Sequence, residues 1–311
     1  LPRRVPTCWA MRPDPAVAKN SLETLQGQPC IRLSTAQGDT ALVALHGAQV
    51  LSWVAGGRER LYLSPQAIFD GQSAIRGGIP LCFPQFNQRG PLPKHGFARN
   101  LAWAAQAPLS DTEQDATVLR LRLHSSPTTR AIWPHDFKAQ LALTLGEGLL
   151  RVQLDVCNTS KTLWEFTAAL HTYLAVDAVE STRLEGLEGC ARWDAVRDQH
   201  GLQSGAVTIA GEYDRVFRAP VQPMRLHDGP HSLQISQSQS LGSTVVWNPG
   251  ASLSSRLPDL PADGYRSMLC AAAAQIDELV PLAPAARWPG WQEPRVLCEQ
   301  NLCATRERSL M

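Results

Sequence analysis

Apolar and polar residues alternate along much of the chain, which is the pattern of β-strands that bury one face. Residues 117–125 show this alternation, and residues 138–160 show it twice, in two runs separated by Gly146 and Gly148. The second segment therefore predicts a β-hairpin. No long stretch combines helical periodicity with capping residues. Three further segments are typical of strands: residues 40–54, with a bend at Gly47, residues 163–176 and residues 243–249.

Turn residues separate these segments. The chain contains 22 glycines and 23 prolines, and many short strands with frequent turns favour a large all-β sandwich or barrel. We find no internal repeat, low-complexity block or interdomain linker. The sequence predicts a single β-sandwich domain over residues 21–297, between an N-terminal tail of residues 1–20 and a C-terminal tail of residues 298–311.

Composition and charge narrow the class of protein. With 44% hydrophobic residues among 311, the chain can bury a substantial core. Lys and Arg number 29 against 28 Asp and Glu, a balance that argues against nucleic-acid binding. No apolar run approaches the roughly 20 residues of a membrane span, and the first residues lack the apolar core of a signal peptide. The eight cysteines include no CxxC pair, so we expect no metal site, and free thiols that fit a reducing cytoplasm. We also expect no cofactor and a monomer.

Basic residues gather in two turn-rich segments. Arg76 opens the sequence RGGIP, and Lys94, His95 and Arg99 lie in KHGFAR. Taken singly, an arginine after a loop usually faces solvent. Together, two guanidinium groups and an ammonium on glycine-bearing loops predict a cradle for a dianion such as a phosphate.

Two further polar residues stand in apolar strands. His171 lies within AALHTYLAV, where it is either a satisfied core residue or a proton donor that works near neutral pH. Strand alternation places it on one face with Ala169 and Tyr173. Asp214 lies within GEYDRVF beside Arg215, with which it would otherwise form a surface ion pair of little value.

Several motifs occur together in one order: RGGIPLCFPQF, PLPKHGFARNLAW, WPHDF, AALHTYLAV, GLEG, GEYDRVF and VVWNPG. From about residue 28 to residue 296, the chain resembles the glucose-6-phosphate 1-epimerases, or hexose-6-phosphate mutarotases, of the aldose 1-epimerase superfamily. The resemblance implies a galactose-mutarotase-like β-supersandwich. It also implies interconversion of the α and β anomers of hexose 6-phosphates.

The resemblance also implies a role for each candidate residue. Arg76 and Arg99 match arginines that contact substrate and phosphate, Lys94 matches a position often held by glutamine, and His95 matches a pocket histidine. His171 matches the catalytic histidine that protonates the ring oxygen, and Asp214 matches the aspartate that binds sugar hydroxyls. The aromatic residues Phe97, Trp103 and Trp247 would form the apolar walls of the pocket or pack in the core.

One position departs from the family. There the catalytic base is a glutamate two residues after a cysteine; here Cys270 aligns and Ala272 stands at the glutamate position. Alanine cannot accept a proton, so we expect impaired activity in this chain and recovery of activity in Ala272→Glu. We also expect the methyl group of Ala272 to point into the pocket across from His171. Three explanations remain open: a glutamate-to-alanine variant made to trap substrate, a natural non-catalytic sugar-phosphate-binding protein, or replacement of the base by Asp277 or Glu278. The last is disfavoured, because Glu278 lies roughly 20 Å along a strand that rises about 3.3 Å per residue.

Overall fold

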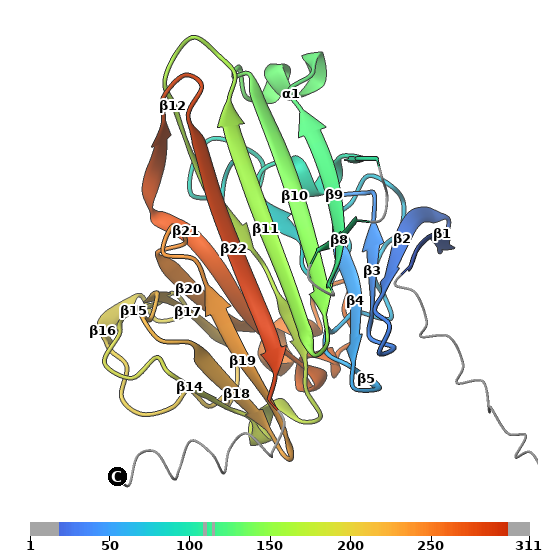
Figure 1. Cartoon of the computed structure of the whole chain (residues 1–311). Coiled ribbons are helices and arrows are strands. Elements are labelled where there is room, and N and C mark those ends of the chain that lie inside the picture. Colours follow the sequence, from blue (N-terminus) through green and yellow to red (C-terminus); the bar gives the residue numbers. More distant parts are fainter. Residues whose placement is uncertain (1–18, 108–110, 114–115, 298–311) are drawn as a thin grey trace, which may run out of the picture.

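The computed structural model describes residues 19–107, 111–113 and 116–297 and is built from three antiparallel sheets (Figure 1). The first strand begins at Lys19, two residues before the predicted start of the domain. The rest of the N-terminal tail and the whole C-terminal tail lie outside the described residues. The all-β prediction is confirmed, since the only helices in the described part of the chain are short.

The nine-stranded sheet is centred on the predicted hairpin. Its two central strands, β10 and β11, pair in full register from Phe137 opposite Asn158 to Gly146 opposite Leu149. The strand order is β14-β18-β19-β22-β11-β10-β9-β7, and β8 also pairs with β9. The bounds are β7 Ala104–Ala105, β8 Asp111–Glu113, β9 Ala116–His124, β10 Phe137–Gly146, β11 Leu149–Asn158, β14 Arg183–Glu185, β18 Met224–Asp228, β19 His231–Gln237 and β22 Arg287–Val296.

The eight-stranded sheet has the order β16-β15-β17-β20-β21-β12-β6, and β13 also pairs with β21. The predicted strand over residues 163–176 is interrupted at His171 and Thr172, where the backbone N–H of Thr172 turns back to the carbonyl of Leu170 at 3.1 Å. The bounds are β6 Leu81–Cys82, β12 Trp164–Leu170, β13 Tyr173–Ala175, β15 Ala191–Asp194, β16 Gln199–Leu202, β17 Tyr213–Arg218, β20 Ser243–Asn248 and β21 Met268–Leu282.

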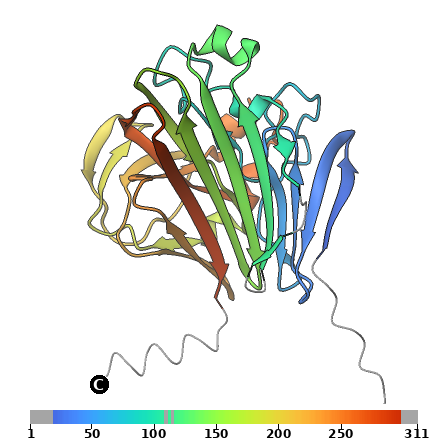
Figure 2. The ribbon, with the colours of Figure 1, turned by 45° about the horizontal axis from the view of Figure 1, so that its top comes forward.

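The five-stranded sheet is a simple meander at the N-terminal end of the domain. It lies beside the β9 edge of the nine-stranded sheet, where the hydroxyl of Thr117 donates to the carbonyl of Ser34 (Figure 2). The predicted segment of residues 40–54 forms its third and fourth strands. The bounds are β1 Lys19–Leu25, β2 Gln28–Ser34, β3 Thr40–Ala44, β4 Val50–Ala55 and β5 Arg58–Glu59.

The main core lies between the two large sheets, and a run of four alanines in β21 shows its boundary. Ala271 and Ala273 belong to this core, whereas Ala272 and Ala274 belong to a second apolar cluster. Because successive side chains of a strand point to opposite faces, this second cluster lies on the outer face of the eight-stranded sheet. That outer face carries the site described below.

Helical segments occupy only connections. They are α1 Pro127–Ile132, α2 Gly250–Ser254 and the 3-10 turns η1 Ala98–Asn100, η2 Val179–Ser181 and η3 Gly264–Ser267. None of the helices in the described residues reaches the length and apolar character that crossing a bilayer would require.

Candidate functional site

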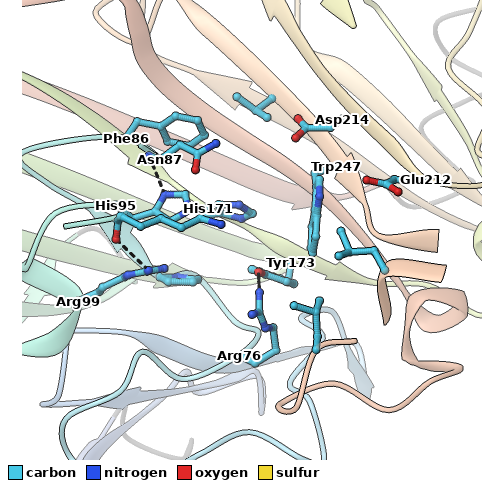
Figure 3. Close-up of a pocket in the computed structure, with 15 residues that line it drawn as sticks. Arg76, Phe86, Asn87, His95, Arg99, His171, Tyr173, Glu212, Asp214 and Trp247 are labelled. Atoms are coloured by element: carbon cyan, nitrogen blue, oxygen red, sulfur yellow. Dashed lines mark hydrogen bonds between the residues drawn. The ribbon is translucent and has the colours of Figure 1, made fainter. Parts of the chain in front are cut away.

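A pocket of about 310 Å³ opens on the outer face of the eight-stranded sheet (Figure 3). The loop before β6, the loop after it, the interruption between β12 and β13, and strands β17 and β20 all contribute to it. Six of the seven predicted site residues line this pocket, and only Ala272 does not. The six are Arg76, Lys94, His95, Arg99, His171 and Asp214.

The floor of the pocket follows the strand register. Asp214, Trp247, Cys270 and Tyr173 lie directly opposite one another on β17, β20, β21 and β13. Directly paired residues project from the same face of a sheet, so this row places Asp214, Trp247 and Tyr173 in the pocket, above the buried Cys270.

His171 lies at the centre of an aromatic group. Its ring stacks on that of Tyr173 with centroids 5.0 Å apart, and it meets the rings of Trp247 at 6.1 Å and His95 at 5.8 Å edge to face. Nδ1 is buried without a hydrogen-bond partner in the described part of the chain. Burial, followed by the positive charges of Arg99 and Arg76, lowers the pKa of His171 to about 3, so these surroundings favour the neutral imidazole at pH 7.

His95 is held by a tight loop. Its backbone has a left-handed φ of 66°, and Gly96 follows at 71°. A Cβ on Gly96 would lie 2.1 Å from the carbonyl oxygen of Phe83, so this position of KHGFAR accepts only glycine. The Nδ1 of His95 accepts the backbone N–H of Asn87 at 3.2 Å and lies 3.1 Å from the thiol of Cys82.

The positive groups of the pocket differ in how far they are neutralised. Arg76 Nε donates to Asp259 at 3.1 Å and its Nη1 donates to the hydroxyl of Tyr173 at 3.0 Å. Arg99 donates from Nη2 to the carbonyl of Lys94 at 3.2 Å, and its Nε is buried without a partner among the described residues. In the part of the chain that the structure describes, neither Arg99 nor Lys94 has a carboxylate partner, so the pocket retains positive charge that suits a dianion.

Two carboxylates line the pocket. Asp214 is half-buried and Glu212 is exposed at the rim. Burial raises the pKa of Asp214 to about 6, although the nearby positive charge of Arg89 acts in the opposite direction. The surface ion pair with Arg215 that the sequence allowed does not form, because Arg215 binds Asp194 at 3.0 Å instead.

Ala272 is fully buried beneath the pocket floor. It pairs with Val245, which lines the pocket, so its methyl group is on the pocket side of β21. Phe86 and Val245 pack in the same apolar cluster and both line the pocket, whereas Ala272 does not reach it. Asp277 binds Arg89 at 3.3 Å and Ser243 at 3.1 Å, and neither Asp277 nor Glu278 lines the pocket.

The sequence reading missed some pocket residues and included others that lie elsewhere. Phe97 and Trp103 pack in the main core, and only Trp247 of the three proposed wall residues lines the pocket. Glu212 was missed, although its position two residues before Asp214 is the spacing of one strand face. Asn87 was missed as well, and no local pattern in the sequence marks it.

Comparison with known proteins gives a consistent result. Residues 29–294 match the family described as aldose 1-epimerase. A protein of Cenchrus ciliaris is 32% identical over 86% of this chain and 85% of its own length. A protein of Salmonella typhimurium is 37% identical over 74% of this chain and 78% of its own length. Both are named as candidate glucose-6-phosphate 1-epimerases.

Solved structures agree with the predicted fold. The structure of a candidate mutarotase from Salmonella typhimurium superimposes with a TM-score of 0.81 at 30% identity, covering 89% of this chain and 93% of its own. A galactose mutarotase-like protein from Clostridium acetobutylicum has a TM-score of 0.69 at 14% identity, with 90% and 98% covered. The galactose-mutarotase-like β-supersandwich predicted from the sequence is confirmed.

Proposed function

This chain belongs to the aldose 1-epimerase family, and from that premise we propose that it interconverts the α and β anomers of a hexose 6-phosphate, glucose 6-phosphate in the first instance. The candidate glucose-6-phosphate 1-epimerases at 32–37% identity support the choice of a phosphorylated sugar.

The reaction needs two proton transfers. A base takes the proton of the C1 hydroxyl, the C1–O5 bond breaks to leave an aldehyde at C1, and an acid gives a proton to O5. Rotation about C1–C2 and the reverse steps then close the ring as the other anomer. In this proposal His171, which lines the pocket, is the acid. It acts as the imidazolium, which a bound phosphate dianion favours by offsetting the charges of Arg99 and Arg76.

The observation that carries the proposal is the group of positive charges around His171. Arg99 and Lys94 lack a carboxylate partner in the described structure, and Arg76 is held in the same pocket by Asp259. A phosphate bound to these groups would hold the sugar ring over Trp247 with O5 near His171. The hydroxyls of the sugar would bind Asp214, and His95 would donate from the edge of the pocket.

A second candidate is a sugar-phosphate-binding protein without activity. Ala272 favours it, because this position cannot supply the base that its family uses. The two candidates share the binding site and differ only in turnover.

Exchange spectroscopy by NMR on the α and β anomers of glucose 6-phosphate distinguishes them. We expect exchange well above the spontaneous rate in the unaltered chain, and a loss of about 10²- to 10⁴-fold in His171→Gln. Binding of glucose 6-phosphate without exchange, in the unaltered chain and in Ala272→Glu, would leave the binding protein as the function. Absence of binding would reject both.

A further inference from the structure

We propose that Asp214 supplies the base that position 272 lacks, taking the proton from the C1 hydroxyl while His171 protonates O5. This inference rests on the proposed anomer exchange and gives Asp214 a role beyond binding sugar hydroxyls.

The first argument is the state of the nearby carboxylates. Among the described residues, Asp214 and Glu212 are the only acidic side chains that line the pocket. The other aspartates close to it are already neutralised: Asp194 by Arg215 at 3.0 Å, Asp259 by Arg76 at 3.1 Å and Asp277 by Arg89 at 3.3 Å.

The carboxylate of Asp214, by contrast, is available for a bound molecule. It makes no hydrogen bond or ion pair with any described residue, although the side chain is half-buried. Such a group is free to accept a proton from a bound molecule. Glu212 is the weaker candidate, because it is exposed at the rim, where water competes for its carboxylate.

The second argument is position. Asp214 lies in the row that continues through Trp247 and Cys270 to Tyr173, whose ring stacks on His171. Strands about 4.8 Å apart place the Cα of Asp214 roughly 10 Å from that of Cys270. In Figure 3 the carboxylate of Asp214 points toward the side of the pocket on which His171 lies. Asp214 and His171 thus both lie next to Trp247 in the same pocket, and a pyranose ring over Trp247 would be within reach of both.

The third argument is protonation. With its pKa raised to about 6, Asp214 is mainly ionised at pH 7 yet basic enough to take a proton. Burial is the main cause. Arg89 and Lys94 face the carboxylate and lower its pKa, while Glu212 and Asp194 raise it.

The proton balance closes within the pocket. Asp214 receives the proton of the C1 hydroxyl as the C1=O bond forms and C1–O5 breaks, and O5 takes its proton from His171 in the imidazolium form. The bound phosphate dianion favours that form, because it offsets the charges of Arg99 and Arg76 that lower the pKa of His171. On ring closure the proton on O5 returns to His171, and Asp214 gives its proton back to the oxygen on C1. No other reactant is required.

The test is Asp214→Asn, which keeps the shape of the side chain and its capacity for hydrogen bonds. We expect kcat for glucose 6-phosphate to fall about 100-fold or more, while KM changes less than about tenfold. The fall in kcat on the acidic side, near pH 6, should disappear. The pH dependence should be measured in kcat. The phosphate of the free substrate also titrates near pH 6, and this titration would affect the pH dependence of kcat/KM.

Glu165→Gln is the matched control, since Glu165 is an exposed carboxylate on β12 outside the pocket. It should leave kcat and the pH profile unchanged. A carboxylate introduced at position 272 gives an independent test. Asp214→Asn combined with Ala272→Glu should recover activity, whereas Asp214→Asn combined with Ala272→Gln should not. If Asp214→Asn does not fold, Asp214→Ser with added formate replaces it, and formate should restore the rate.

The outcomes separate this inference from the proposed function. Asp214→Asn with kcat within threefold of the unaltered chain, or with its acidic limb retained, overturns the assignment. An inactive unaltered chain with an active Ala272→Glu variant also overturns it but leaves anomer exchange intact as the function of the site. Failure of every variant to exchange glucose 6-phosphate would instead reject the proposed function.

Discussion

The backbone N–H of Asn87 donates to Nδ1 of His95 over 3.2 Å. An imidazole nitrogen that accepts a hydrogen bond carries no proton, so the proton of neutral His95 lies on Nε2. The reciprocal bond, from the N–H of His95 to the carbonyl of Asn87 at 3.0 Å, holds the two residues together. A contact between loop residues thus makes His95 a hydrogen-bond donor toward the pocket.

The two pocket histidines predict a pH dependence of stability. Burial lowers the pKa of His95 to about 2 and that of His171 to about 3, below the value of about 6.5 in an unfolded chain. The unfolded state therefore binds more protons below pH 6.5. The free energy of unfolding should fall there by up to about 1.4 kcal/mol per pH unit for each histidine, and both contributions should be complete above that pH.

Urea unfolding of the unaltered chain and of His171→Gln between pH 5 and 8 checks this. The variant should lose stability less steeply as the pH falls. The comparison between the two proteins matters, because the raised pKa of Asp214 acts in the opposite direction between about pH 4 and 6. His200→Gln, at an exposed site, should keep the original slope, and an unchanged slope in His171→Gln would contradict the argument.

Arg99→Gln should weaken binding of glucose 6-phosphate about tenfold or more and leave binding of glucose nearly unchanged. The reason is that the Nε of Arg99 is buried and has no partner among the described residues, so a phosphate oxygen would satisfy it. A charge-assisted bond contributes roughly 1.5–3 kcal/mol. Isothermal titration calorimetry with both sugars measures this. Equal affinities of the unaltered chain for glucose and glucose 6-phosphate would refute the phosphate site.

Arg76→Gln should behave differently from Arg99→Gln. Arg76 is the ion-pair partner of Asp259, whose side chain is only 16% exposed. Its loss would leave a largely buried carboxylate unpaired, so this variant should lose thermal stability as well as affinity. A Tm equal to that of the unaltered chain would contradict this reading of the Arg76–Asp259 pair.

Binding of a sugar phosphate should raise the pKa of His171. After burial, the charges of Arg99 and Arg76 lower it most, and a dianion bound to these arginines would cancel much of their effect. NMR titration of the His171 ring with and without glucose 6-phosphate measures the change. Glucose should have a smaller effect, and Arg99→Gln should reduce the change caused by the phosphate. An unchanged or lower pKa in the complex would place the phosphate elsewhere.

Ala272→Glu should raise the rate of anomer exchange, whereas Ala272→Gln, of the same size, should not. Both longer side chains would start from a fully buried Cα and would have to fit beside Phe86 and Val245. We therefore expect both variants to lose about 1–3 kcal/mol of stability by overpacking. Exchange rates by NMR and unfolding by urea separate the two effects. Equal rates in the two variants would show that a carboxylate at this position does not reach the substrate.

The sequence by itself determined what depends on local pattern. Period-two alternation was enough to predict the β10–β11 hairpin, because a strand with one buried face imposes that period on its own residues. The motifs identified six residues that the fold brings into one pocket, and residue identity alone shows that position 272 has no titratable group.

The tertiary structure decided what depends on partners distant in the chain. Pairing with β20 places Ala272 under the floor while its neighbours face the main core. The tertiary structure also decided which charged groups form ion pairs. Arg215 pairs with Asp194 on the adjacent strand, and Asp214 has no ion-pair partner within the described ranges. Ion pairs and strand register arise from contacts across the sheet, and alternation along one strand does not specify which residue of another strand will lie opposite.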